Sequence, residues 1–242
     1  MKILFIRHAD PDYEHDSLTE KGWREAEFLA KRLSNVRMDY VYSSPLGRAR
    51  DTMNCTLKLN GKEAVVKDFL REFEAPIWRP DVKDKKKNCW DWLPCDWMDD
   101  ERFFSKDHWM EPKPMADGHV YDEYLRVVNG FDEILKEHGY SREKNYYRVD
   151  RANNDVIAVF CHFGVQMVIL SHMFNVSPMI MWHHFCTLPS TVTTVYSEER
   201  RPGIAAFRAS VLGDQTHLWE NDEEPSFSAR FAEIYGDGTR LD

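Results

Sequence analysis

The stretch Val156-Ile-Ala-Val-Phe-Cys-His162-Phe-Gly164 has the strongest strand character in the chain. Its apolar run ends at Cys161, and a histidine and a glycine follow directly. The residues from Phe163 to about Phe174 then continue as an apolar helix. A buried strand that leads straight into a helix is the unit from which parallel sheets with helices on both faces are built.

The same alternation of short apolar runs and longer amphipathic segments extends along the rest of the chain. Strands are expected at Ile3–Ile6, Tyr40–Ser43, Val65–Phe69, Thr191–Ser197 and Ile204–Val211. Helices are expected at Thr19–Leu33, from Ser44 to about Leu57 and at Tyr121–His138, whereas residues 141–154 are polar and receive no assignment. The predicted fold is therefore α/β: a three-layer α/β/α sandwich with a mostly parallel central sheet.

Residues 76 to about 120 break this rhythm. Five of the eight tryptophans lie here among several prolines: Trp78, Trp90, Trp92, Trp97 and Trp109. We expect one domain over residues 1–242, with this Trp- and Pro-rich segment inserted as a cap. The acidic stretch that follows the last strand is expected on the surface.

Composition limits the class of partner. The 242 residues are 43% hydrophobic and carry a net charge of −9, and their basic residues form no long block. An acidic protein of this kind does not suit nucleic acid or an anionic membrane surface. Five scattered cysteines and an N-terminal apolar run too short for a signal peptide predict a cytoplasmic protein. Whether it forms a homodimer stays open.

Polar residues directly after buried strands are candidates for a site, because ligands of open α/β sheets bind at the carboxyl ends of the strands. His8 follows the first strand behind Arg7, and His162 follows the strand that ends at Cys161. Arg48, one turn into the next helix, is expected at the same edge. Two arginines and two histidines at a helix N-terminus predict a site for a small dianion, most simply a phosphoryl group.

The motifs resemble those of the histidine phosphatase superfamily, also called the phosphoglycerate mutase-like family. They occur in the family's order and span residues 3 to about 197. The matching stretches are Arg7-His8-Ala9, Leu18-Thr-Glu-Lys-Gly22, Ser43-Ser-Pro-Leu-Gly-Arg48-Ala49 with Thr52, Leu70-Arg71-Glu72 and Cys161-His162-Phe163-Gly164.

The resemblance implies that His8 is a nucleophile that becomes phosphorylated, clamped by Arg7, Arg48 and His162. It implies that Glu72 protonates the leaving oxygen, with Glu74 or a carboxylate of the cap as alternatives. It also places Ser190, in the turn before a late strand, as a phosphate contact.

The expected activity is metal-independent hydrolysis of a small phosphorylated metabolite. A phosphoglycerate-type mutase is the alternative enzyme, although Asp10-Pro-Asp-Tyr-Glu14 departs from the mutase pattern and favours hydrolysis. A phospho-ligand binding module whose catalysis has decayed is the alternative of a different class. The cap is expected to cover the pocket and set substrate choice.

No cofactor and no metal site are expected. The set Cys89, Cys95, His108 and His119 departs from the short loop spacings of structural zinc sites. The chain also lacks the Gly-rich loop G-x-x-x-x-G-K that cradles nucleotide phosphates.

Overall fold

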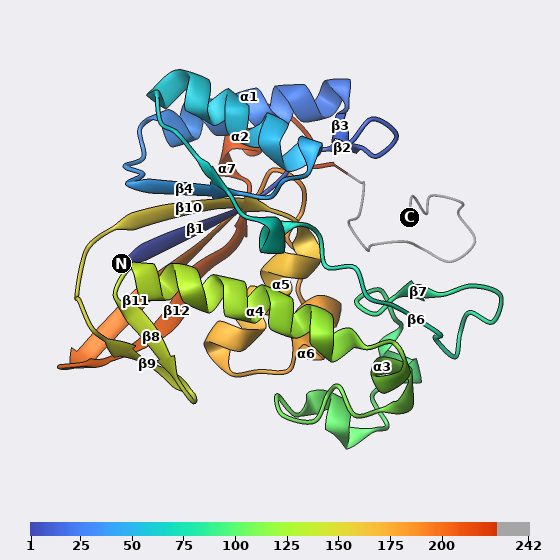
Figure 1. Ribbon diagram of the computed structural model, residues 1–242. Helices are drawn as coiled ribbons and strands as arrows, with labels where there is room; N and C mark the ends of the chain where they lie inside the picture. Colours follow the sequence, from blue (N-terminus) through green and yellow to red (C-terminus); the bar gives the residue numbers. More distant parts are fainter. Residues whose placement is uncertain (227–242) are drawn as a thin grey trace.

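An eight-stranded sheet runs through the centre of the protein in the computed structural model, which describes residues 1–226 (Figure 1). The parallel half contains, in spatial order, β5 (Val65–Val66), β4 (Tyr40–Ser43), β10 (Val156–Cys161) and β1 (Lys2–Arg7). Antiparallel pairings then add β11 (Val192–Arg201), β12 (Ile204–Asp214), β9 (Tyr146–Val149) and β8 (Tyr140–Glu143).

Helices cover both faces of this sheet, which confirms the predicted α/β sandwich (Figure 1). One face carries α1 (Glu20–Ser34), α2 (Gly47–Asn60) and the short α7 (Thr216–Trp219). The other carries α4 (Val120–Glu137), α5 (Phe163–Phe174) and α6 (Pro178–His184). Nearly every residue of α5 is buried, because this helix is apolar on all sides and lies between the sheet and its neighbours.

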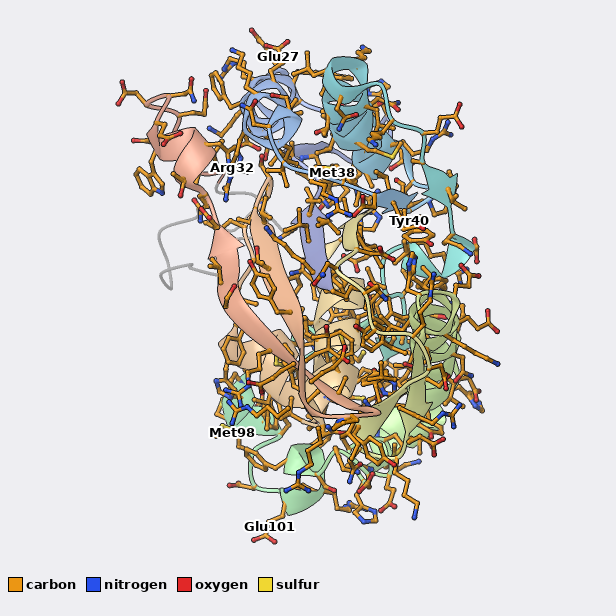
Figure 2. The ribbon with its side chains drawn as sticks, turned by 90° about the vertical axis from the view of Figure 1, so that its left-hand side faces the viewer. Glu27, Arg32, Met38, Tyr40, Met98 and Glu101 are labelled. Carbon is orange, nitrogen blue, oxygen red and sulfur yellow. The ribbon has the colours of Figure 1, made fainter. Side chains whose placement is uncertain are left out.

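The cap is built from short elements instead of a helix–strand alternation. It contains β6 (Pro76–Ile77), β7 (Lys87–Asn88), the 3₁₀ turns η2 (Pro94–Asp96) and η3 (Glu101–Phe104), and α3 (Lys113–Asp117). Figure 2 shows Met98 and Glu101 of the cap at the opposite end of the molecule from Glu27 and Arg32 of α1. Trp92, Trp97 and Trp109 are buried and belong to the main hydrophobic core, so they anchor this segment on the domain, whereas Trp78 is exposed.

Several boundaries differ from the sequence prediction. The strand expected at Val65–Phe69 ends after Val66, because residues 68–70 turn into the 3₁₀ helix η1 (Asp68–Leu70). The second helix begins at Gly47 and not at Ser44. The unassigned residues 141–154 contain most of the β8–β9 hairpin. Part of the acidic C-terminal stretch, residues 227–242, lies outside the described residues.

Candidate active site

Two buried histidines directly follow the carboxyl ends of two neighbouring parallel strands. Arg7 of β1 pairs in register with Cys161 of β10, so His8 and His162 leave the sheet side by side. The centroids of the two rings are 5.0 Å apart. The topology therefore brings together the two imidazoles that the sequence placed at strand ends.

His8 has one protonated nitrogen and one free lone pair. Its Nδ1 lies 2.8 Å from the carbonyl oxygen of Ala9. Because a carbonyl only accepts, Nδ1 carries the proton and Nε2 keeps its lone pair. Burial lowers the pKa of His8 well below its usual value, and the charges of Arg7 and Arg48 lower it further. At neutral pH Nε2 is therefore unprotonated, the state that a nucleophile requires.

His162 has one ring nitrogen bonded and one without a partner. Its Nε2 lies 2.7 Å from the Ser44 Oγ. Its Nδ1 is shielded from solvent and has no hydrogen-bond partner among residues 1–226. Burial lowers the pKa of His162 well below its usual value, so this ring is also neutral. A buried polar atom without a partner costs free energy, and a hydrogen bond to a ligand would remove that cost.

Arg48 reaches the histidines from the first turn of α2. Its Nη1 donates to Asp16 Oδ1 at 2.7 Å, and the Gly47 N–H donates to Asp16 Oδ2 at 2.6 Å. A Cβ at Gly47 would lie 1.9 Å from the Asp16 carbonyl oxygen, so only glycine allows this approach. The exposed Tyr13 ring lies 5.4 Å from the Arg48 guanidinium carbon and forms part of the rim.

Arg7 is the second cation of the site. It is 2% exposed, and its Nη1 donates to the carbonyl oxygen of Thr187 at 2.5 Å. The Nε atoms of Arg7 and Arg48 are both shielded from solvent without a partner in the described part of the chain. Two fixed positive charges beside two neutral histidines form a site that fits the oxygens of a dianion.

Glu72 contacts the N-terminal end of α5. Its Oε1 accepts the N–H groups of Phe73 at 2.7 Å and Val165 at 3.0 Å. Both bonds use Oε1, so Oε2 holds the proton when the carboxyl is protonated. Burial raises the pKa of Glu72, while the backbone bonds and the nearby arginines oppose that rise. A Cβ at Gly164 would lie 2.8 Å from Oε1, so this glycine lets the carboxyl approach the helix.

Two other predicted residues lie in different surroundings. Glu74, the alternative acid, is exposed. Ser190 is buried, and its Oγ lies 2.9 Å from His217 Nε2 and 3.4 Å from the Glu25 carbonyl oxygen. The Ser190 N–H donates to the carbonyl oxygen of His8 at 2.9 Å. These contacts do not support the phosphate contact predicted at Ser190, because they engage its hydroxyl with His217 and the Glu25 backbone.

The structure adds site residues that sequence reasoning missed. Asp16 and Thr187 orient the arginines from positions 32 and 180 residues away, and such contacts have no local signal. Ser44 lies in a recognised motif, but we expected it as a helix cap. Its hydroxyl bonds His162 and accepts the Leu46 N–H, outside the helix.

Two further properties concern the described residues as a whole. Residues 1–226 contain no group of three or more His, Cys, Asp or Glu side chains placed to hold a metal ion. Within the same residues, every helix is too short or too polar to cross a lipid bilayer.

The chain resembles known proteins over most of its length. The family model of the histidine phosphatase superfamily (branch 1) matches residues 3–209. Phosphoserine phosphatase 1 of Hydrogenobacter thermophilus is 22% identical over 214 residues, which cover 83% of this chain and 89% of that protein. The solved structure of Entamoeba histolytica phosphoserine phosphatase with phosphoserine has a TM-score of 0.59 at 16% identity, covering 90% of this chain and 98% of the other.

A shorter likeness concerns a mutase. The 2,3-bisphosphoglycerate-dependent phosphoglycerate mutase of Thermoplasma acidophilum is 35% identical over 83 residues. The match covers 30% of this chain and 42% of the mutase.

Proposed function

This chain belongs to the histidine phosphatase superfamily, and we propose that it hydrolyses phosphomonoesters of small metabolites through a phosphohistidine at His8. One observation carries the proposal: a buried neutral His8, with Nε2 unprotonated, stands beside His162 and two arginines. The likeness to two phosphoserine phosphatases supports a small substrate.

In the first step Nε2 of His8 attacks phosphorus, forming the P–N bond as the P–O bond to the alcohol breaks. The Ala9 carbonyl holds the Nδ1 proton in place, so the positive charge of the phosphorylated ring stays hydrogen-bonded. Glu72 gives its Oε2 proton to the departing oxygen. Its raised pKa suits this role, because burial favours the protonated acid.

In the second step water attacks phosphorus and the P–N bond breaks. Glu72, now a carboxylate, accepts a proton from the water, and His8 returns to its neutral state. Transfer through His8 thus replaces one difficult displacement with two easier ones. The same carboxyl acts as acid and then as base, so no net proton change remains on the protein.

Positive charge and N–H donors of the protein stabilise the transferred group. Arg7 and Arg48 provide fixed charge in a buried site, where such charge is most effective. When the Ser44 hydroxyl donates to Nε2 of His162, the single proton of this neutral ring lies on Nδ1. The Nδ1–H of His162 is then a donor for a phosphoryl oxygen. Because side chains supply the nucleophile, the acid and the charge, we propose that the reaction needs no metal.

The first test is turnover of p-nitrophenyl phosphate by the full chain in excess EDTA. His8→Ala is expected to lower kcat by about 10⁴-fold or more, because the nucleophile is lost. His15→Ala is the matched control, since His15 is an exposed histidine that bonds Asp12. Mass spectrometry after acid-free quenching should find the phosphoryl group on the His8 peptide. Full activity of His8→Ala would end the covalent mechanism.

A phosphoglycerate-type mutase is the second candidate, favoured by the likeness to the Thermoplasma mutase. A mutase returns the phosphoryl group to a bound product and not to water. Incubation with 2- and 3-phosphoglycerate separates the two functions, because hydrolysis predicts phosphate release without interconversion. Interconversion faster than phosphate release would make the mutase the better description.

A further inference from the structure

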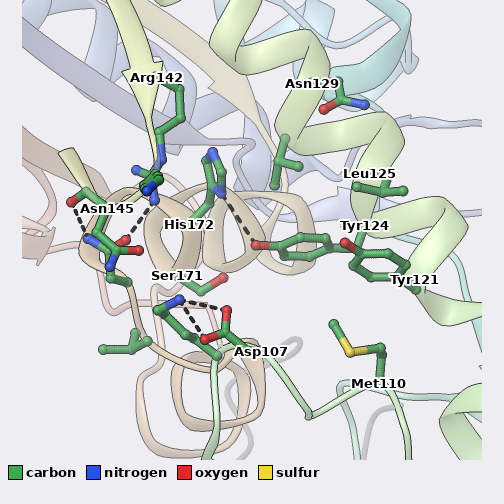
Figure 3. Close-up of a pocket in the computed structure, with 15 residues that line it drawn as sticks. Asp107, Met110, Tyr121, Tyr124, Leu125, Asn129, Arg142, Asn145, Ser171 and His172 are labelled. Atoms are coloured by element: carbon green, nitrogen blue, oxygen red, sulfur yellow. Dashed lines mark hydrogen bonds and ion pairs between the residues drawn. The ribbon is translucent and has the colours of Figure 1, made fainter. Parts of the chain in front are cut away.

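A cavity on the α4–α5 face is lined by neither His8 nor His162 (Figure 3). It has a volume of about 280 Å³, and its lining includes none of the catalytic candidates. The cap, α4, the β8–β9 hairpin and the C-terminal end of α5 all contribute to its walls. Because α5 begins at Phe163, one rigid helix connects this cavity to the catalytic histidines.

Arg142 of β8 is the main polar feature of the cavity. Its Nη2 donates to Asn175 Oδ1 at 2.6 Å, and its guanidinium carbon lies 4.9 Å from the centre of the Tyr147 ring. Its Nε and Nη1 are shielded from solvent and have no hydrogen-bond partner among residues 1–226. Buried donors on a charged group are costly to leave unpaired.

The nearby carboxylates do not neutralise Arg142. Asp132 accepts from Tyr147 Oη at 3.2 Å, and its other oxygen lies 2.9 Å from His172 Nε2. Asp107 is bonded to Lys106 at 2.6 and 2.8 Å (Figure 3). Within the described chain no carboxylate forms an ion pair with Arg142. The cavity therefore has one partly buried cation with shielded donors that no carboxylate neutralises, while Lys144 lies exposed in its lining.

The opposite wall is aromatic and apolar. Tyr121 and Tyr124 stack with ring centroids 5.8 Å apart and an interplanar angle of 15°. In Figure 3 these rings face the side from which Arg142 and His172 enter, and Leu125 and Met110 flank them. Tyr124 is fixed further by the contact of its hydroxyl with His172 Nδ1 at 3.4 Å. A wall of this kind suits a flat or apolar body.

We propose that this cavity binds a small carboxylate with an aromatic or apolar body, its carboxyl group against Arg142 and its body against the tyrosines. The one guanidinium with shielded, unpaired donors favours a monoanion, in contrast to the two arginines of the catalytic pocket. Such a ligand would touch both the cap and the far end of α5.

The test is a ¹⁹F NMR titration of 4-fluorobenzoate into the full chain. We expect saturable binding to the wild type, and binding at least about tenfold weaker to Arg142→Gln, as expected for a lost bond to a charged group. Lys136→Gln is the matched control, because it removes one exposed cation of α4 outside the cavity. Neutral 4-fluorobenzamide should bind at least about tenfold more weakly than the acid.

Two further variants make the result decisive. Leu125→Trp, at a partly exposed position in the cavity wall, should block binding without altering Arg142. Arg48→Gln should retain binding, because it changes only the catalytic pocket. The proposal fails if the wild type shows no saturable binding up to the order of 10 mM. It also fails if Arg142→Gln and Leu125→Trp bind like the wild type, or if Arg48→Gln loses binding.

Discussion

The loop that follows β1 lies between two groups of polar residues, which differ in how many of their buried atoms have hydrogen-bond partners. The pocket side contains Arg7, Arg48 and His162. The supporting side contains Ser190, His217 and Glu25. On the pocket side, three buried nitrogens remain without partners in the described chain: Arg7 Nε, Arg48 Nε and His162 Nδ1. On the supporting side most polar groups bond one another, although Glu25 Oε1 has no hydrogen-bond partner among residues 1–226. His217 Nδ1 lies 3.4 Å from Arg32 Nη1, which only donates, so Nε2 carries the proton and donates to Ser190 Oγ.

The pKa values alone would not separate these two sides. Burial lowers the pKa of His8 and also that of His217, the latter to about 4. Burial raises the pKa of Glu72 and also that of Glu25, the latter to about 7. The difference lies in the partners: the unpaired nitrogens of the two arginines and of His162 lie on the side that would bind the ligand. Substitutions on the pocket side should therefore affect activity, and those on the supporting side stability.

The largest effect on the pocket side is expected from Glu72→Gln, which removes the proton that the proposed mechanism transfers. With an alkyl phosphate, kcat should fall by about 10²–10⁴-fold, the usual contribution of a general acid. With p-nitrophenyl phosphate the fall in the first step should be much smaller, because that leaving group hardly needs protonation. Burst kinetics measure the first step separately.

Glu74→Gln is the matched control, because Glu74 is the exposed carboxylate two residues away. Equal losses with both leaving groups in Glu72→Gln would assign the acid to another residue. A loss in Glu74→Gln that depends on the leaving group would identify that residue.

The next largest effect is expected from Arg48→Gln, which should lower kcat/KM by about 10²–10³-fold. Losses of this size are typical when one preorganised donor to the developing negative charge is removed. Urea unfolding should show a change of about 1 kcal/mol or less, since the ion pair that is lost joins Arg48 to an Asp16 carboxylate that is 43% exposed. Arg50→Gln controls for charge, because Arg50 is exposed on the same helix. Loss of activity in both variants would indicate a general charge effect.

The two sides also differ in how far the sequence predicted them. His8 and His162 follow from a local rule, since each stands directly after a buried strand, and the strand Val156–Cys161 agrees in both boundaries. Arg48 was predicted at the same site because it lies in the first turn of its helix. Asp16 could not be predicted this way, because its contact with Arg48 depends on how the loop before α1 packs on α2.

Ser190 shows a second reason why prediction fails. The prediction at Ser190 was a phosphate contact, whereas the structure shows its N–H bonded to the His8 carbonyl. The direction of its hydroxyl depends on a positive φ of 64° and on His217, 27 residues away. Neither feature is visible in a local motif. Residues 76 to about 120 were singled out by their tryptophans and prolines. Composition alone does not specify the short elements of this segment.

On the supporting side Glu25 should make stability depend on pH. Its folded pKa of about 7 exceeds the usual 4.5, so the folded protein holds a proton that the unfolded chain releases between these values. The free energy of unfolding should therefore fall as pH rises through this window, by up to about 3 kcal/mol.

Urea unfolding at pH 5 and pH 8 measures this effect as the difference between wild type and Glu25→Gln, which cannot titrate. The subtraction removes the opposing contribution of the buried histidines. Glu27→Gln, on the exposed side of α1, should keep the wild-type pH dependence. An unchanged pH dependence in Glu25→Gln would mean that Glu25 is ionised in the folded protein.

The smallest effect, and the sharpest test of the comparison, is expected from Ser190→Ala. The variant leaves the His217 Nε2–H without its acceptor, which should cost about 1–3 kcal/mol of unfolding free energy. KM for a phosphate ester should stay within a few fold of the wild type, because the hydroxyl faces the supporting side. A large rise in KM with unchanged stability would show that Ser190 contacts the phosphate. The distinction between a pocket side and a supporting side of the loop would then be wrong.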